Sequence, residues 1–204
     1  MISVEFLVTS LVVVLIPGTG VIFTVSTGIA QGRKASLWAA LGCTLGILPH
    51  LLATVLGLAA VMHTSAMAFQ ILKIAGVLYL LYIAYATWQD KTAFAIDKMA
   101  PKVTALRLVI RAMLLNVLNP KLTIFFLAFL PQFVNVESPS SLNQMLLLSG
   151  VFMGMTFAVF VAYGVMAHAF RTVVIESSIV QNWLRRSFAA AFAGLGASLA
   201  FSER

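Results

Sequence analysis

The sequence predicts an all-α membrane protein with six transmembrane helices, and three observations support this. First, 61% of the 204 residues are hydrophobic and only 9% are charged, whereas a soluble domain carries about 25% charged residues. Second, apolar residues form runs whose lengths are comparable to the roughly 20 residues that one membrane-spanning helix needs. Third, charged residues lie almost entirely between these runs. We therefore expect one integral-membrane domain over residues 1–204, with no soluble domain.

Six apolar runs follow one another along the chain. They cover Phe6–Ala30, Ala35–Met62, Ala66–Gln89, Ala112–Val136, Leu142–Phe170 and Ser187–Phe201. Lys73 interrupts the third run and Lys121 the fourth. The sixth run is short, so we expect it to place Ser202 and Glu203 at the headgroups or to thin the bilayer locally. The first residues lack the positive region of a signal peptide, so we expect the first run to be retained.

Basic residues are confined to alternate loops. The loops after the first, third and fifth runs hold ten of the thirteen Lys and Arg residues, and the loops after the second and fourth hold none. The ten are Arg33, Lys34, Lys91, Lys98, Lys102, Arg107, Arg111, Arg171, Arg185 and Arg186. Because Lys and Arg favour cytoplasmic loops, both termini are expected on the outer side. The net charge of +7 is therefore explained by topology, and no nucleic-acid partner is expected.

Breaks at matching places in the two halves predict a 3+3 inverted repeat. We expect repeats at about residues 4–89 and 112–204, joined by a cytoplasmic loop at about 90–111. The first helix contains the sequence IPGTG (16–20), and the fourth, its counterpart, contains LNPK (118–121). Interrupted helices in corresponding positions of two halves are a pointer to the substrate site of a transporter.

The second and fifth runs share a further feature. Gly42 and Gly46 are spaced GxxxG in the second run, and Gly150 and Gly154 have the same spacing in the fifth. Small residues at this spacing let helix backbones approach closely. The spacing therefore favours close helix packing in both halves.

Each break carries a residue that can begin a new half-helix. Proline is tolerated at the first helical position because its missing N–H would have no partner there. Asn119 is expected to cap a half-helix that starts at Pro120. Pro17 would start the other, with Gly18 and Gly20 permitting unusual backbone angles. The two amino ends would create partial positive charge near the middle of the membrane, which attracts an anion. The alternative is a simple packing kink at each proline.

Lys121 adds a full positive charge beside the second break. Burying it unpaired would cost about 2.5–3.5 kcal/mol on insertion scales, and no acidic residue lies inside any run. We interpret an anionic ligand group as its partner; the alternatives are carbonyls freed by the break, or snorkelling. The predicted substrate site comprises Pro17, Gly18, Thr19, Gly20, Asn116, Asn119, Pro120 and Lys121.

His50 follows Pro49 in the second run. Histidine changes its charge near neutral pH, so His50 is a candidate for proton coupling. The alternative is a neutral histidine that is bonded to a neighbouring helix, and the sequence leaves both open. Cys43 is the only cysteine, and neither clustered metal ligands nor a G-x-x-x-x-G-K-[ST] loop is present. We therefore expect no metal and no cofactor.

Three segments resemble the LysE-type translocators, the lysine-exporter and homoserine/threonine-exporter family. The strongest is NVLNPKLTIFFLAFLPQFV (116–134), followed by LKIAGVLYLLYIAY (72–85) and PGTGVIFTVSTGIAQGRKASLWAALGCTLG (17–46). The resemblance covers nearly the full length. It implies a six-helix exporter of amino acids or similar small metabolites in the bacterial inner membrane, with periplasmic termini, energy from the proton gradient and a homodimer.

Two departures from the family pattern concern the site. Many members have Pro-Gly-Pro-Asn where this chain has the sequence PGTG at 17–20. Many also carry an acidic residue in the second helix, where this chain has Pro49 and His50. A proton-coupling role of that acid therefore does not carry over to this chain.

The leading functional interpretation is a secondary exporter of a small, neutral zwitterion that works by alternating access. A passive channel is an alternative. Dependence of transport on the proton gradient would distinguish a coupled exporter from such a channel. Metal-ion transport would need clustered His, Cys or carboxylate ligands. An intramembrane enzyme would need H-E-x-x-H, a Ser-His pair or two membrane aspartates. The sequence contains no H-E-x-x-H and no aspartate in a run, and nothing supports a pair such as Ser26 with His50.

Overall fold

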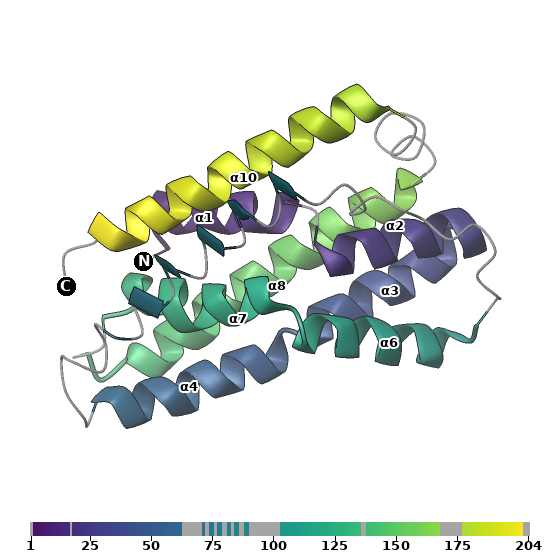
Figure 1. Cartoon of the computed structure of the whole chain (residues 1–204). Helices are drawn as coiled ribbons and strands as arrows, with labels where there is room; N and C mark the ends of the chain where they lie inside the picture. Colours follow the sequence, from purple (N-terminus) through teal and green to yellow (C-terminus); the bar gives the residue numbers. More distant parts are fainter. Residues whose placement is uncertain are drawn as a thin grey trace.

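The computed structural model describes residues 2–16, 18–62, 103–135, 138–167 and 177–201, and helical residues scattered between 71 and 89. Within these ranges the chain forms α-helices with short π and 3-10 segments, and it contains no strand. The helices lie lengthwise in a bundle, with α10 along one side and α4 and α6 along the opposite side (Figure 1). The prediction of an all-α protein is therefore confirmed for this part of the chain.

The first candidate span is bent at the place where a break was predicted. Helix α1 (Val4–Leu15) and helix α2 (Thr19–Gln31) meet at an angle of 53°. The residues next to the break, Ile16 and Gly18, have extended backbone, which ends one helix before the next begins. Pro17, which was expected to start the half-helix, lies outside the described residues.

The second span follows through Gly32, whose φ of +88° favours glycine. It consists of α3 (Arg33–Leu45) and α4 (Leu48–Met62), which are joined by a turn at Gly46 and Ile47. The stretch Arg33–Gly57 is long and apolar enough to cross a membrane. The third expected span lies mostly outside the described residues.

The run that was expected to form the fourth span is also bent, and its helix begins earlier than the run. Helix α6 (Ala105–Val117) precedes α7 (Pro120–Ile124), a π segment (Phe125–Phe129) and a 3-10 segment (Leu130–Phe133). The two arms of this span meet at 61°. Leu108, Ala112 and Asn116 form a buried stripe at helical spacing. Since this stripe starts before 112, part of the expected cytoplasmic loop is helical.

Two long helices complete the bundle. Helix α8 (Ser141–Val165) has 25 residues and no break, and it can cross a membrane alone. Helix α10 (Ser178–Phe201) has 24 residues. It begins nine residues before Ser187, where the sixth span was expected to start. Part of the expected basic loop is therefore continuous with the last helix.

Only one of the two GxxxG stripes packs against a described helix. A Cβ atom added to Gly46 would lie 2.7 Å from the carbonyl oxygen of Met113, and one added to Gly42 would overlap the backbone of Val109. These glycines therefore allow α3 and α6 to approach closely. Gly150 and Gly154 are exposed on α8, and no described residue lies within 4 Å of a Cβ added at either position.

The glycine contacts also give the helix directions. Gly20 lies against Phe160 and Gly28 against Gly164, so α2 and α8 run parallel. Gly42 lies against Val109 and Gly46 against Met113, so α3 and α6 also run parallel. The turn at Gly32 reverses the chain between α2 and α3. Helix α6 therefore runs opposite to α2, and α8 runs opposite to α3.

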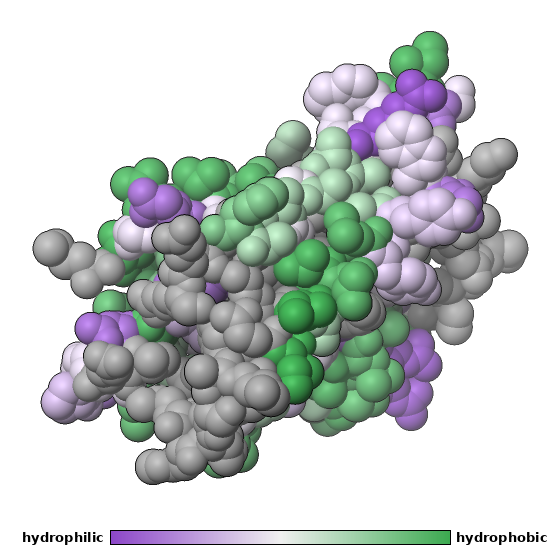
Figure 2. Space-filling model, turned by 60° about the vertical axis from the view of Figure 1, so that its left-hand side comes forward, coloured by the Kyte–Doolittle hydropathy of each residue, from purple (hydrophilic) through white to green (hydrophobic). Residues whose placement is uncertain are grey.

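The described surface is that of a membrane protein. Two single helices and two bent pairs are long and apolar enough to cross a membrane. Large apolar side chains are widely exposed, including Leu118 and Ile179, each at 80%. Figure 2 shows hydrophobic residues across the middle of one face and hydrophilic residues mostly toward its ends. Such a distribution suits a bilayer and does not suit water.

Candidate functional site

The carboxyl end of α1 is capped by side chains from the second half of the chain. The last carbonyls of a helix have no partner within it. Lys121 Nζ donates to the carbonyl oxygens of Val13, at 2.9 Å, and Ile16, at 2.8 Å. Tyr163 on α8 donates its hydroxyl to the carbonyl oxygen of Leu15 at 2.9 Å. The first break is therefore held by α7 and α8.

Lys121 bonds to backbone carbonyls, which the sequence analysis gave as an alternative to an anionic ligand. Its ammonium lies against carbonyls that the break has freed. The carboxyl end of a helix carries roughly half a negative charge, which favours a cation there. An ammonium has three N–H donors, and two are used by these carbonyls. The third can be directed to a ligand without breaking either bond.

The second break has the predicted cap. The side-chain oxygen of Asn119 accepts a hydrogen bond from the backbone N–H of Lys121 at 3.1 Å. Pro120 is the first residue of α7, where a proline loses no helical hydrogen bond. Both predictions are confirmed, and they explain why the chain turns sharply within an apolar segment.

Asn116 connects the second break to the second span. Its side-chain Nδ2 donates to the carbonyl oxygen of Cys43 at 2.6 Å, and its Oδ1 accepts from Asn119 Nδ2 at 3.2 Å. Its backbone carbonyl oxygen also lies 3.0 Å from Nε2 of His50. Asn116 is only 1% exposed, so these bonds satisfy polar atoms that have little access to water.

His50 lies directly beside this break. Because a carbonyl oxygen only accepts, Nε2 of His50 must carry the proton and donate to Asn116. In a neutral ring the other nitrogen, Nδ1, accepts from the Thr123 hydroxyl, which lies 3.4 Å away. The ring also stacks against Phe126 with the centroids 6.3 Å apart. These contacts fit the neutral histidine bonded to a neighbouring helix that the sequence left open.

Glycines bring the two breaks into contact. A Cβ atom added to Gly20 would lie 2.8 Å from Asn116 Oδ1 and 2.9 Å from the ring of Phe160. One added to Gly18 would lie 3.5 Å from Lys121 Nζ. The backbone of the first break therefore lies directly against the side chains of the second.

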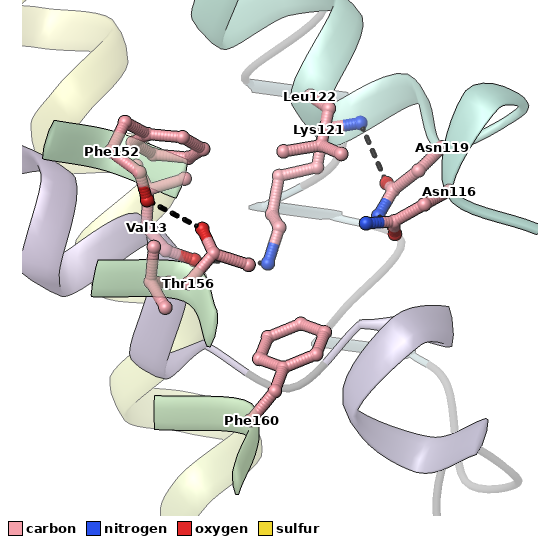
Figure 3. Close-up of a pocket in the computed structure, with 9 residues that line it drawn as sticks. Val13, Asn116, Asn119, Lys121, Leu122, Phe152, Thr156 and Phe160 are labelled. Carbon is pink, nitrogen blue, oxygen red and sulfur yellow. Dashed lines mark hydrogen bonds between the residues drawn. The ribbon is translucent and has the colours of Figure 1, made fainter. Parts of the chain in front are cut away.

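A small cavity lies where the breaks meet. Its volume is about 10 Å³, which is near the minimum for one water molecule and far below the roughly 300–1,000 Å³ of a small-molecule pocket. In Figure 3, Lys121 reaches from α7 toward Val13 and Thr156, with Asn116 and Asn119 together on one side. The lining residues are Val13, Val14, Asn116, Asn119, Lys121, Leu122, Phe152, Thr156 and Phe160. A larger ligand requires these elements to move apart.

The structure brings together most of the predicted site. Of the predicted residues, Asn116, Asn119 and Lys121 line the cavity, and Gly18 and Gly20 adjoin them. Thr19 is exposed and is absent from the cavity wall.

The sequence did not indicate the contribution of α8. Phe152, Thr156 and Phe160 recur at every fourth residue on one helical face, but only Thr156 is polar. Thr156 bonds back to the carbonyl oxygen of Phe152 at 2.8 Å. Tyr163 was also not recognised. In the part of the chain that the structure describes, no group of three or more His, Cys, Asp or Glu residues could hold a metal ion.

Comparisons with known proteins give a consistent result. The family described as LysE type translocator matches residues 11–203. The homoserine/homoserine lactone efflux protein of Salmonella typhimurium is 30% identical over 195 residues, which cover 96% of this chain and 94% of that protein. The leucine efflux protein of Salmonella choleraesuis is 30% identical over 138 residues, or 66% of this chain and 64% of that protein.

A membrane protein of Vibrio cholerae that is described as uncharacterized is 31% identical over 130 residues, which cover 64% of this chain. The match spans 63% of that protein, less than two thirds of its length. No solved structure matches the chain.

Proposed function

The chain belongs to the LysE type translocator family, and from this premise we propose that it is a secondary exporter of neutral amino acids or similar small zwitterions. Relatives that are named for efflux of leucine and of homoserine and its lactone support transport over catalysis. These compounds share an α-amino group and have no charged side chain.

The observation that carries the proposal is the position of Lys121 at the meeting point of two broken helices. Its ammonium borders the cavity, and its two contacts are neutral carbonyls. A substrate carboxylate would form a charge-assisted hydrogen bond with this ammonium, which is about twice as strong as a neutral one. The amino end of α7, next to Asn119, would add partial positive charge.

A neutral side chain fits the rest of the site. The apolar wall of the cavity includes Val14, Leu122, Phe152 and Phe160. All six acidic residues of the sequence lie outside the six apolar runs. A cationic side chain would therefore add an uncompensated charge in the membrane, which is expensive. We infer a substrate of the size and polarity of leucine or homoserine.

We propose six spans in two inverted repeats, at about residues 4–89 and 112–204, in a bacterial inner membrane with both termini in the periplasm. The opposite directions of the first and fourth spans support this arrangement. Alternating access would follow from rocking one repeat against the other. Reporter fusions after residues 32 and 137 test the orientation: the first should report cytoplasm and the second periplasm.

We propose that the proton gradient drives export, with His50 as the candidate proton carrier. The ring of His50 has its Nδ1 beside the Thr123 hydroxyl. That hydroxyl also lies 3.4 Å from the carbonyl oxygen of Asn119. It can therefore turn to this carbonyl and accept from a protonated ring, which gives both forms of His50 a partner. His50→Gln should abolish acceleration by a pH gradient; full retention would exclude this role. Export that ignores the gradient in the wild-type protein would favour a passive channel.

The test of function is counterflow of radiolabelled leucine and homoserine in proteoliposomes that contain the full chain. Lys121→Met should lower the initial rate by about tenfold or more, because hydrogen bonds to charged groups contribute about 1.5–3 kcal/mol. The control is Lys34→Met, since Lys34 is exposed at the start of α3. Equal rates for wild type and Lys121→Met, at equal incorporation, would overturn the proposed site.

A further inference from the structure

An ammonium group already occupies a defined position at the first break. Lys121 Nζ bonds to two carbonyl oxygens at the end of α1, those of Val13 and Ile16, at 2.9 and 2.8 Å. We call these two carbonyls the α1 cradle. It combines two acceptors with the partial negative charge of a helix carboxyl end, so it suits any primary ammonium and is not specific to lysine.

We propose that the α1 cradle is the subsite for the α-ammonium group of the substrate, which exchanges with Lys121 on binding. The substrate ammonium takes the carbonyls of Val13 and Ile16, and Lys121 turns to the substrate carboxylate. The inference rests on the proposed function and deepens it by naming the substrate class: molecules that carry a primary ammonium and a carboxylate on the same carbon.

The exchange keeps the charges of the site balanced. One ammonium leaves the cradle and another arrives, and the displaced Lys121 meets a carboxylate. A zwitterion has no net charge, so the membrane interior gains none. An amine without a carboxylate would displace Lys121 and leave its charge unpaired, which is expensive in a membrane. Tight binding to the wild-type protein therefore requires both charges.

The surrounding contacts favour a cradle that keeps its shape during the exchange. Tyr163 donates to the intervening carbonyl of Leu15, independently of Lys121. The cap of α7 uses the backbone N–H of Lys121 and the side chain of Asn119, so it does not depend on the ammonium. The long, flexible stem of Lys121 can therefore swing while both helix ends stay in place. Its movement also widens a cavity of only about 10 Å³.

Two analogues of leucine, each with only one of its charged groups, test the ammonium subsite and the carboxylate subsite separately. 3-Methylbutylamine keeps the side chain and the ammonium, and 4-methylpentanoate keeps the side chain and the carboxylate. Their affinities for the purified full-length protein in nanodiscs are measured by calorimetry. In Lys121→Met the α1 cradle has no competing ammonium, so the amine should bind about tenfold more tightly than to the wild-type protein, while leucine and the carboxylate bind more weakly.

The outcomes distinguish the two proposals. If Lys121→Met binds leucine as well as the wild-type protein does, the proposed carboxylate site fails. If leucine binding is lost but the amine binds no better than to the wild-type protein, the exchange fails and the carboxylate site stands. Lys34→Met, on the exposed start of α3, is the matched control and should change neither affinity.

A second measurement uses only the wild-type protein, so it tests the exchange even if Lys121→Met does not fold. If a carboxylate draws Lys121 away from the α1 cradle, saturating acetate should tighten the binding of 3-methylbutylamine. We expect an increase of about fivefold, the lower end of usual coupling between sites. Unchanged amine affinity with and without acetate, at constant ionic strength, would overturn the exchange.

Discussion

The two breaks lie against each other, yet they contribute different chemistry. The first break offers backbone: glycines that lie against the other helices, and carbonyls at the end of α1. The second break offers side chains, those of Asn116, Asn119 and Lys121. Acceptors on one side therefore face donors on the other.

This difference shows how two unlike helix breaks can form an asymmetric site. Two identical breaks would place like ends and like groups together. Here Lys121 of the second break satisfies carbonyls of the first, and its ammonium lies beside Gly18. A zwitterionic substrate needs both an acceptor set and a donor set, and neither break supplies both.

The largest effect is expected from adding a side chain to the first break. Gly20→Ala places a methyl group 2.8 Å from Asn116 Oδ1 and 2.9 Å from the ring of Phe160. Overpacking of this kind costs about 1–3 kcal/mol, so leucine counterflow should fall by about tenfold and the thermal midpoint should drop. Gly57→Ala is the control, because no described residue lies within 4 Å of its Cβ. Equal behaviour of the two variants would contradict close contact between the breaks.

The next effect concerns the side chain that links the second break to the second span. Asn116→Ala removes the donor to the Cys43 carbonyl and the acceptor for Asn119 Nδ2. Leaving buried polar groups without partners costs about 1–3 kcal/mol each. Thermal unfolding in detergent should show this loss, while Asn143→Ala, at an exposed position on α8, should change stability little. A stable Asn116→Ala variant would show that this network is not structural.

Removal of a helix cap should have a smaller effect, and it separates stability from transport. Asn119→Ala and Ser3→Ala each delete an N-cap, one at the second break and one at the start of α1. Each should lose about 1 kcal/mol of unfolding free energy. Only Asn119→Ala should slow counterflow, since Asn119 lines the cavity. Equal rates in the two variants would argue that the second break has no direct role in binding.

The smallest effect is expected at Tyr163. Tyr163→Phe removes the hydroxyl that donates to the carbonyl of Leu15, which contributes about 0.5–1.5 kcal/mol. The first break should loosen while the carboxylate site stays intact, so the maximal export rate should change more than the KM for leucine. A rise in KM as large as that of Lys121→Met would show that Tyr163 contacts the substrate.

Much of the architecture could be predicted from the sequence, because apolar runs, prolines and caps act locally. The cap at Asn119, the start at Pro120 and the break in the first span follow from short-range backbone rules. Helix ends were less predictable: α6 starts at Ala105 because the buried stripe through Leu108 extends into a basic segment. The sequence-based prediction placed the start of this helix after the basic residues, because the packing that buries Leu108 could not be seen in the sequence.

The site was predicted only where its residues are chemically distinctive. Asn116 and Lys121 stand out in an apolar run, but Val13 and Phe160 look like any lipid-facing residue. The contact of Lys121 with the end of α1 joins residues more than 100 positions apart. The sequence offered carbonyls freed by a break as one of several possible partners of Lys121. Which carbonyls the ammonium can reach depends on how the two halves of the chain pack together.

The most direct test is an experimental structure of the protein with bound leucine. The account predicts that the leucine carboxylate lies within about 2.7–2.9 Å of Lys121 Nζ, the usual length of such a bond. It also predicts the leucine ammonium on the carbonyls of Val13 and Ile16. Leucine bound elsewhere, with Lys121 still on those two carbonyls, would contradict the account.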